Sequence, residues 1–193
     1  MPLRHRLAAV LVATVWGANF VAIHASLAQF PPFLLIAMRF LLVAIPTILF
    51  VPRPRVAWRW LIGCGLALGV GQFGFLYLAM AIGMPAGLAS LVLQAQAPFS
   101  LILGAVLLAE TVRRRQWVGI ALSVLGMVLV GVSRAGVGAV LPFVLTIAGG
   151  FCWALGNLSS RRSQADNALR FALWWSVVVP VPLLILSLVV EGP

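Results

Sequence analysis

The sequence predicts an all-α integral membrane protein with about seven transmembrane helices. Hydrophobic residues make up 63% of its 193 residues and charged residues only 8%, a composition that ordinary soluble domains do not reach. The apolar residues fall into seven runs of roughly 20 residues, the length of helix that crosses a hydrocarbon core about 30 Å thick. The predicted spans are residues 7–27, 31–51, 58–80, 84–109, 116–132, 139–158 and 171–190.

The first span follows a short basic N-terminus. Its apolar run ends close to Ser26 and Ala28, small residues of the kind at which a signal peptide is cleaved. The run also carries Trp16, Asn19 and His24, and six further spans follow it. We therefore expect a retained helix, with His24 at the membrane interface rather than acting as a proton carrier.

The second span carries Arg39 near its middle. An arginine there costs at least about 2.5 to 3.5 kcal/mol, and no predicted span contains an aspartate or glutamate to neutralise it. One interpretation is that Arg39 faces a central cavity and binds the carboxylate of a zwitterionic solute, because a guanidinium offers paired donors. The other is that it caps backbone carbonyls freed near Pro46 or Pro98, or extends toward the membrane surface.

The fourth span is interrupted by two glutamines and a proline. Pro98 lacks the N–H that would bond the carbonyl of Gln94, and an unpaired carbonyl inside a bilayer needs another partner. Gln94 and Gln96 point to nearly opposite sides of a regular helix, unless a distortion at Pro98 turns one of them. Broken helices with polar groups at this depth hold substrates in transporters. Glutamines that only join neighbouring helices are the alternative.

Small residues recur at four-residue spacing in several spans. Without a hydrophobic driving force between helices in lipid, such pairs allow the close backbone approach that holds a bundle together. The pairs are Gly65 with Gly69, Gly83 with Gly87, Gly119 with Ser123, and Gly150 with Ala154.

The arginines predict the orientation. Eleven of the 13 basic residues fall on one side of the predicted spans, whereas the opposite loops contain only Arg134. Because basic loops stay in the cytoplasm, we expect a multi-pass protein of the inner (plasma) membrane with a cytoplasmic N-terminus. Glu110 is then expected to form a solvated salt bridge at the cytoplasmic surface, beside the run Arg113 to Arg115. The eleven are Arg4, Arg6, Arg53, Arg55, Arg59, Arg113, Arg114, Arg115, Arg161, Arg162 and Arg170.

Two features return at nearly the same period. WGANF at 16–20 resembles WALGNL at 153–158, and the proline run at 43–50 resembles the one at 178–186. Five spans fit into one period, and an odd number makes the second copy enter the membrane from the other side, as in inverted-repeat transporters. We therefore expect a ten-helix (5+5) plan of which this chain is the front part. Residues 1–135 would be the first five-helix repeat and residues 136–193 the first two helices of a truncated second repeat.

The repeat gives the candidate binding residues counterparts in both halves. Trp16 and Asn19 share a helix face and match Trp153 and Asn157, while Arg39 falls opposite Trp175 in the repeat register. Taken singly, each of these residues also suits packing between helices. The predicted substrate-binding residues are Arg39, Asn19, Trp16, Gln94, Gln96, Trp153, Asn157 and Gln72, with Tyr77 a weaker candidate.

Five stretches give the chain a family resemblance: VWGANFVAIHASL (15–27), PPFLLIAMRFLLVAIPTILFVPRP (31–54), GMPAGLASLVLQAQAPF (83–99), GIALSVLGMVLVG (119–131) and FCWALGNLSSRR (151–162). In collinear order they resemble EamA-type transporters of the drug/metabolite transporter superfamily, most closely the O-acetylserine/cysteine exporters. The resemblance implies two inverted five-helix halves around a central cavity, and outward movement of small metabolites, often amino acids. The last three helices of that plan are absent here.

The resulting hypothesis is a secondary transporter that exports cysteine, O-acetylserine or a related metabolite by alternating access. Its rival is a truncated fragment or half-subunit without independent activity, and the expected partners are lipid, the small substrate, and either a second copy or the missing helices. No enzyme is expected, because the sequence has no HExxH or GxSxG motif and no acid pair. No metal, cofactor or nucleic-acid partner is predicted. A retinal receptor is excluded because the chain has no lysine.

Overall fold

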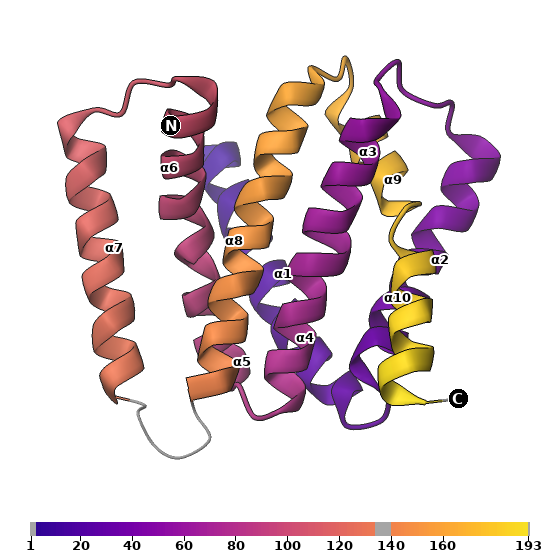
Figure 1. Ribbon diagram of the computed structural model, residues 1–193, viewed down its shortest axis with the longest axis horizontal. Coiled ribbons are helices and arrows are strands. Elements are labelled where there is room, and N and C mark those ends of the chain that lie inside the picture. Colours follow the sequence, from indigo (N-terminus) through magenta and orange to yellow (C-terminus); the bar gives the residue numbers. More distant parts are fainter. Residues whose placement is uncertain (1–2, 134–139, 193) are drawn as a thin grey trace.

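Among the residues that the structure describes, seven helices are long and apolar enough to cross a membrane, and they pack as an antiparallel bundle. The structure is a computed structural model, and it describes residues 3–133 and 140–192. Every regular element in those ranges is helical. The loops at residues 51–57, 109–113 and 164–167, each with arginines in the loop or in the adjoining helix ends, lie at one end of the bundle, uppermost in Figure 1, and we call this the basic end.

Four of the membrane-length helices are continuous and three are divided. The continuous ones are α1 (Leu3–Leu27), α2 (Pro32–Phe50), α7 (Arg114–Ser133) and α8 (Val140–Ser163). The third span consists of α3 (Trp58–Cys64), the π-helix η1 (Gly65–Gln72) and α4 (Phe73–Ala81). The fourth consists of α5 (Ala86–Val92), the 3₁₀ turn η2 (Leu93–Ala95) and α6 (Gln96–Leu108). The seventh consists of α9 (Ala168–Ser176), α10 (Pro180–Leu186) and the π-helix η3 (Ser187–Glu191).

The prediction of seven membrane-spanning helices is confirmed, but several helices extend beyond their apolar runs. The first begins at Leu3 rather than at residue 7, and α8 continues through its arginines to Ser163 rather than ending at residue 158. Hydropathy marks where side chains become polar, whereas the backbone stays helical into the headgroup layer. The side chain of Asn167 accepts a hydrogen bond from the Arg170 N–H and so starts α9 before residue 171.

Pro98 and Pro180 each sit in the first turn of a new helix segment. Pro98 is the third residue of α6, directly after the 3₁₀ turn, and Pro180 is the first residue of α10. Amides in a first helical turn have no partner within the helix, so the missing N–H of a proline costs little there. Pro46, in contrast, lies inside an uninterrupted α2.

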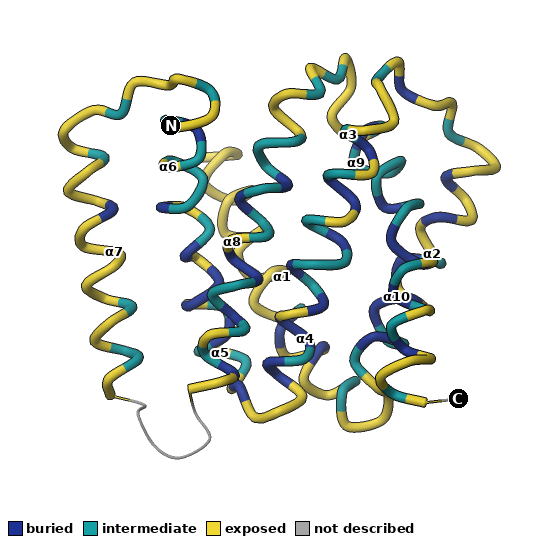
Figure 2. The backbone as a smooth tube through the Cα atoms, viewed as in Figure 1, coloured by how far each residue is buried: buried dark blue, intermediate teal, exposed yellow. Residues whose placement is uncertain are grey.

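Helix α8 occupies the middle of the bundle and contacts the third and fourth spans. The main core lies where α2, α4 and α10 meet, and includes the fully buried Ile36, Leu76 and Leu183. Figure 2 shows that α1 and α7 are mostly exposed. The outer helix α7 contacts mainly η2 and α6.

Two of the four small-residue pairs lie at close helix contacts. A Cβ added to Gly65 or Gly69 would collide with the seventh span, and Gly150 lies against the backbone of Leu93 and Gln96. The prediction is wrong for Gly87 and Gly119, because a Cβ there meets nothing within 4 Å. The four-residue spacing of small residues therefore does not by itself show which face of a helix a neighbouring helix covers.

Both ends of α2 are tied to the seventh span. At its start the cap residue is Pro31, which has no side-chain acceptor. The Glu191 carboxylate instead accepts hydrogen bonds from the amides of Phe33 and Leu34, at 2.6 and 3.1 Å. At the basic end, the Trp174 indole N–H donates to the Val51 carbonyl at 3.1 Å.

Replacing Glu191 with alanine is expected to lower the free energy of unfolding by about 1 to 2 kcal/mol, because two amides at the start of α2 lose a charged cap. Unfolding of the purified protein in mixed micelles, followed by circular dichroism, measures the change. Asp166→Ala is the matched control, since Asp166 is exposed and makes none of the hydrogen bonds found among the described residues; it should change stability by less than about 0.5 kcal/mol. Equal effects of the two variants would contradict the capping role.

Candidate functional site: a membrane cavity around Arg39

A cavity of about 340 Å³ lies among the first, second, third, fourth, sixth and seventh spans, and we call it the Arg39 cavity. Its polar lining consists of Arg39, Asn19 and Gln72. The three tryptophans at its wall are Trp16, Trp153 and Trp175. The remaining lining residues are Val15, Phe20, Leu68, Phe73, Leu76 and Leu93. No lining residue is acidic, so the guanidinium is the one formal charge at this cavity.

Arg39 is held by the third span. Its Nη1 donates to the Tyr77 hydroxyl at 2.9 Å, and its Cζ lies 5.1 Å from the centre of the Phe73 ring. Tyr77 is only 2% exposed, and Phe73 and Tyr77 lie one helical turn apart on α4, so both face α2. The contact with Tyr77 occupies one of five guanidinium donors, and Arg39 itself is exposed to the cavity. Its other donors are therefore available to an anion.

The tryptophans of the two segments that the repeat pairs, 16–20 and 153–158, contact each other. Trp16 on α1 and Trp153 on α8 form an edge-to-face pair with ring centroids 5.2 Å apart and planes at 80°. Trp175 lies opposite, in the same cavity as Arg39 and within 5.9 Å of the Phe40 ring. Residues that the repeat register pairs, Trp16 with Trp153 and Arg39 with Trp175, thus line one cavity.

The other predicted site residues lie elsewhere. Gln94 does not line the Arg39 cavity but borders two neighbouring cavities. Gln96 and Asn157 face each other between α6 and α8, where the Asn157 amide donates to Gln96 Oε1 at 3.4 Å and to Ser100 Oγ at 3.3 Å. Five of the eight predicted residues are therefore brought together, and three are not.

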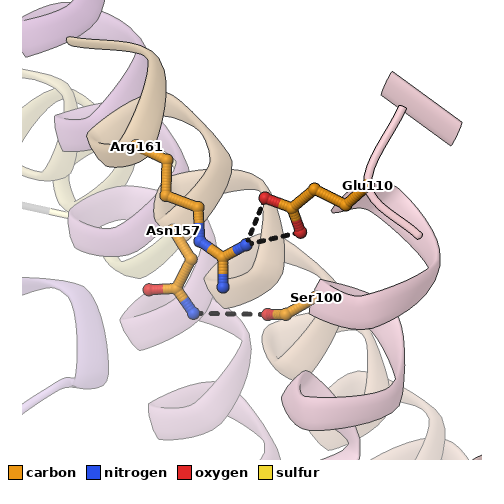
Figure 3. Close-up of polar contacts among 4 residues, drawn as sticks. All are labelled: Ser100, Glu110, Asn157 and Arg161. Carbon is orange, nitrogen blue, oxygen red and sulfur yellow. Dashed lines mark hydrogen bonds and ion pairs between the residues drawn. The ribbon is translucent and has the colours of Figure 1, made fainter. Parts of the chain in front are cut away.

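The contact between α6 and α8 continues to the basic end as a row of polar pairs, which we call the α6–α8 seam. Figure 3 shows Asn157 with Ser100 and, beyond them, Arg161 with Glu110. The Arg161–Glu110 ion pair has N–O distances of 3.1 and 3.0 Å. The predicted salt bridge of Glu110 thus exists, but its partner comes from α8 rather than from the adjacent Arg113–Arg115 run. Both side chains are about half exposed, so the pair adds little stability.

Sequence reasoning ranked Tyr77 low and did not include Phe73. The available signal was their spacing of four residues in the same span, which places an aromatic ring and a hydroxyl on one helix face. The sequence does not show that this face packs against α2. A hydroxyl oxygen that accepts a hydrogen bond and a ring face are the groups that a lone membrane arginine recruits when no carboxylate is present.

Comparison with known proteins places the chain in a family. The model of the EamA-like transporter family matches residues 5–132. No solved structure matches the chain.

Three relatives illustrate how far the similarity extends. A protein of Salmonella typhimurium (strain LT2) named a probable amino-acid metabolite efflux pump is 47% identical over 190 residues, covering 95% of this chain and 64% of that protein. Its namesake in Escherichia coli K12 is 44% identical with the same coverage. The inner membrane transporter YedA of Escherichia coli K12, described as uncharacterized, is 25% identical over 91% of this chain and 59% of its own length.

The chain thus spans 64% of the length of its first two relatives. The family resemblance seen in the sequence is confirmed by a family match over most of the chain and by two relatives that are 47% and 44% identical along nearly all of it. This chain belongs to the EamA-like transporter family.

Proposed function

We propose that this chain forms the substrate-holding part of a secondary transporter that exports small amino-acid metabolites, such as cysteine or O-acetylserine, across the inner membrane. The observation that carries the proposal is Arg39, a guanidinium presented to a cavity at membrane depth without any acidic neighbour in its lining. Two of the relatives described above are named probable amino-acid metabolite efflux pumps, which supports the same class of substrate.

The chemistry of the cavity selects a zwitterion. Arg39 supplies donors for the carboxylate, and charge-assisted hydrogen bonds of this kind are the strong ones in proteins. The ammonium group of the same solute needs acceptors, which the carbonyl oxygens of Asn19 and Gln72 supply, and it is also attracted by indole faces. A dicarboxylate or a bare cation would leave a charge without a partner.

We propose that the basic end is cytoplasmic and that export proceeds by alternating access. The Arg39 cavity extends from the middle of the bundle away from the basic end, as the positions of its lining residues along their helices indicate. The α6–α8 seam occupies the half toward the basic end. Release of the seam would give the cytoplasm access to the cavity, which is the movement that an alternating-access cycle requires.

We propose further that the chain comprises one five-helix repeat, residues 1–135, and two helices of a second, residues 136–193. This boundary lies outside the described residues. Helices α1 and α7 expose long apolar faces, and the relatives are longer than this chain. Either a second copy or additional helices would then cover those faces, and the rival proposal is a fragment that does not transport alone.

Counterflow in proteoliposomes tests the proposal. The purified chain is reconstituted alone, and also together with the part of the Salmonella relative beyond the aligned region, and uptake of labelled L-cysteine and O-acetyl-L-serine is measured. We expect saturable counterflow in at least one arm, inhibited by an excess of the unlabelled amino acid. Counterflow only in the second arm supports the half-subunit proposal, and an absence of both binding and counterflow in both arms contradicts the proposed function.

A further inference from the structure

We infer that a second cavity beside the Arg39 cavity is a side-chain subsite, in which Gln94 hydrogen-bonds the uncharged polar side chain of the transported amino acid. This inference rests on the proposed function and specifies the substrate class. The cavity has a volume of about 550 Å³. We call it the Gln94 cavity, and its lining is Ala13, Trp16, Gly17, Phe20, Gly87, Ser90, Leu91, Leu93, Gln94 and Trp153.

The two cavities adjoin each other across the tryptophan pair. Trp16, Phe20, Leu93 and Trp153 line both of them, so no further layer of protein separates the two spaces. A solute whose carboxylate is bound at Arg39 can therefore direct its side chain past the indoles into the Gln94 cavity.

Gln94 is a polar group without a protein partner at membrane depth. It lies eight residues inside the fourth span, which begins at Ala86, or about 12 Å along the helix axis. Its side chain is exposed, and none of the hydrogen bonds found among the described residues uses its amide. A primary amide in an apolar medium costs several kcal/mol of lost hydration unless something bonds it. Gln94 borders two cavities, and of these the Gln94 cavity is the one that shares lining residues with the Arg39 cavity, so a solute held at Arg39 can reach the amide there.

Gln96 has a different role from Gln94. Its carbonyl accepts from Asn157, and its side chain faces α8 rather than either of the two cavities. Gln94 lies within the 3₁₀ turn Leu93–Ala95, whereas Gln96 is the first residue of α6. One glutamine of the pair joins helices, and the other remains free for a solute.

The lining of the Gln94 cavity indicates the kind of side chain it accepts. It contains no charged group, so a cationic or acidic side chain would lose its hydration without gaining a partner. The polar atoms available are the Gln94 amide and the oxygen of Ser90, whose hydroxyl donates to the Gly87 carbonyl at 2.7 Å. A thiol, hydroxyl, ester or amide side chain can bond these atoms. An apolar side chain of the same size leaves the amide unpaired, and sites of this design reject such analogues.

Competition binding on the full chain in lipid nanodiscs tests the inference. Labelled O-acetyl-L-serine is displaced by two pairs of ligands, L-cysteine with L-2-aminobutyrate and O-acetyl-L-serine with L-norleucine, in which the second member lacks the polar group. For the wild-type chain we expect each polar ligand to bind at least about fivefold more tightly than its apolar partner. The variants are Gln94→Met, which keeps the length of the side chain without the amide, and Gln96→Met as the matched control.

In Gln94→Met, the ratio of the affinity for a polar ligand to the affinity for its apolar partner should fall to near one, with the affinity for L-2-aminobutyrate unchanged. In Gln96→Met, the wild-type ratio should persist. A wild-type chain that binds both members of each pair equally, or a preference that survives Gln94→Met, overturns the subsite while leaving the proposed function standing. If none of the four amino acids binds the wild-type chain, either alone or together with the part of the Salmonella relative beyond the aligned region, the proposed function itself is wrong. The wild-type comparison decides the question even where Gln94→Met fails to fold.

Discussion

Replacing Arg39 with alanine is expected to weaken the binding of amino-acid ligands by roughly tenfold to a hundredfold, the equivalent of about 1.5 to 3 kcal/mol for hydrogen bonds to a charged group. The guanidinium is the one formal charge in the lining of its cavity, so no neighbouring cation can take over the carboxylate. Tryptophan fluorescence reports the binding, because Trp16, Trp153 and Trp175 all line the cavity.

Ligand variation shows whether the lost interaction is the one with the carboxylate. Cysteamine has the thiol and ammonium groups of cysteine without the carboxylate, so it should bind the wild-type chain as weakly as cysteine binds Arg39→Ala, and it should not distinguish the two proteins. Tyr77→Phe removes the 2.9 Å hydrogen bond that orients Arg39 but keeps the ring, and a loss of about two- to fivefold is expected. If Arg39→Ala weakens cysteine and cysteamine equally, Arg39 is a packing or capping residue rather than a carboxylate ligand.

Replacing Gly65 with alanine is expected to destabilise the bundle by about 1 to 3 kcal/mol, the cost of overpacking a tight contact. The added Cβ would lie 2.7 Å from the Trp175 carbonyl oxygen and 2.9 Å from the Val178 Cβ. The first of these is a backbone atom near the end of α9, just before the interruption of the seventh span, so it cannot rotate away as the end of a long side chain does. The substitution must push the seventh span outward and so also enlarge the Arg39 cavity at Trp175.

Thermal unfolding in detergent, read by reaction of a thiol dye with the fully buried Cys64, measures this effect. Gly119→Ala is the control, because a Cβ at Gly119 meets nothing within 4 Å, and the change should be neutral or slightly stabilising through helix propensity. A midpoint for Gly65→Ala within error of Gly119→Ala would show that the third and seventh spans are not in close contact in the folded protein.

Hydropathy was sufficient to find the seven helices, since each must satisfy its own backbone within the bilayer. It did not show the interruptions at Gly65–Gln72 and between Ser176 and Pro180. The first depends on which helices lie opposite: Gly65 and Gly69 of η1 are covered by the seventh span and Gly71 by α8, and long-range contacts of that kind leave no periodic signal in the sequence. The second coincides with Pro180, the first residue of α10.

The repeat predicted site residues correctly only where its two segments keep the same spacing. Trp16 and Trp153 correspond and meet, but Asn19 follows its tryptophan by three residues whereas Asn157 follows by four. One residue is about 100° around a helix. The difference turns Asn157 away from the Arg39 cavity and toward Ser100 on α6, although the two segments have similar sequences.

The ties at the two ends of α2 link ligand binding to the tilt of the seventh span. Arg39 lies between a carboxylate cap from Glu191 and an indole bond from Trp174, so α2 and the seventh span reorient together or break one of these bonds. A tilt of the seventh span therefore displaces the guanidinium in the same step. By thermodynamic reciprocity, a solute that binds Arg39 better in one tilt stabilises that tilt by the same free energy, without touching Glu191 or Trp174.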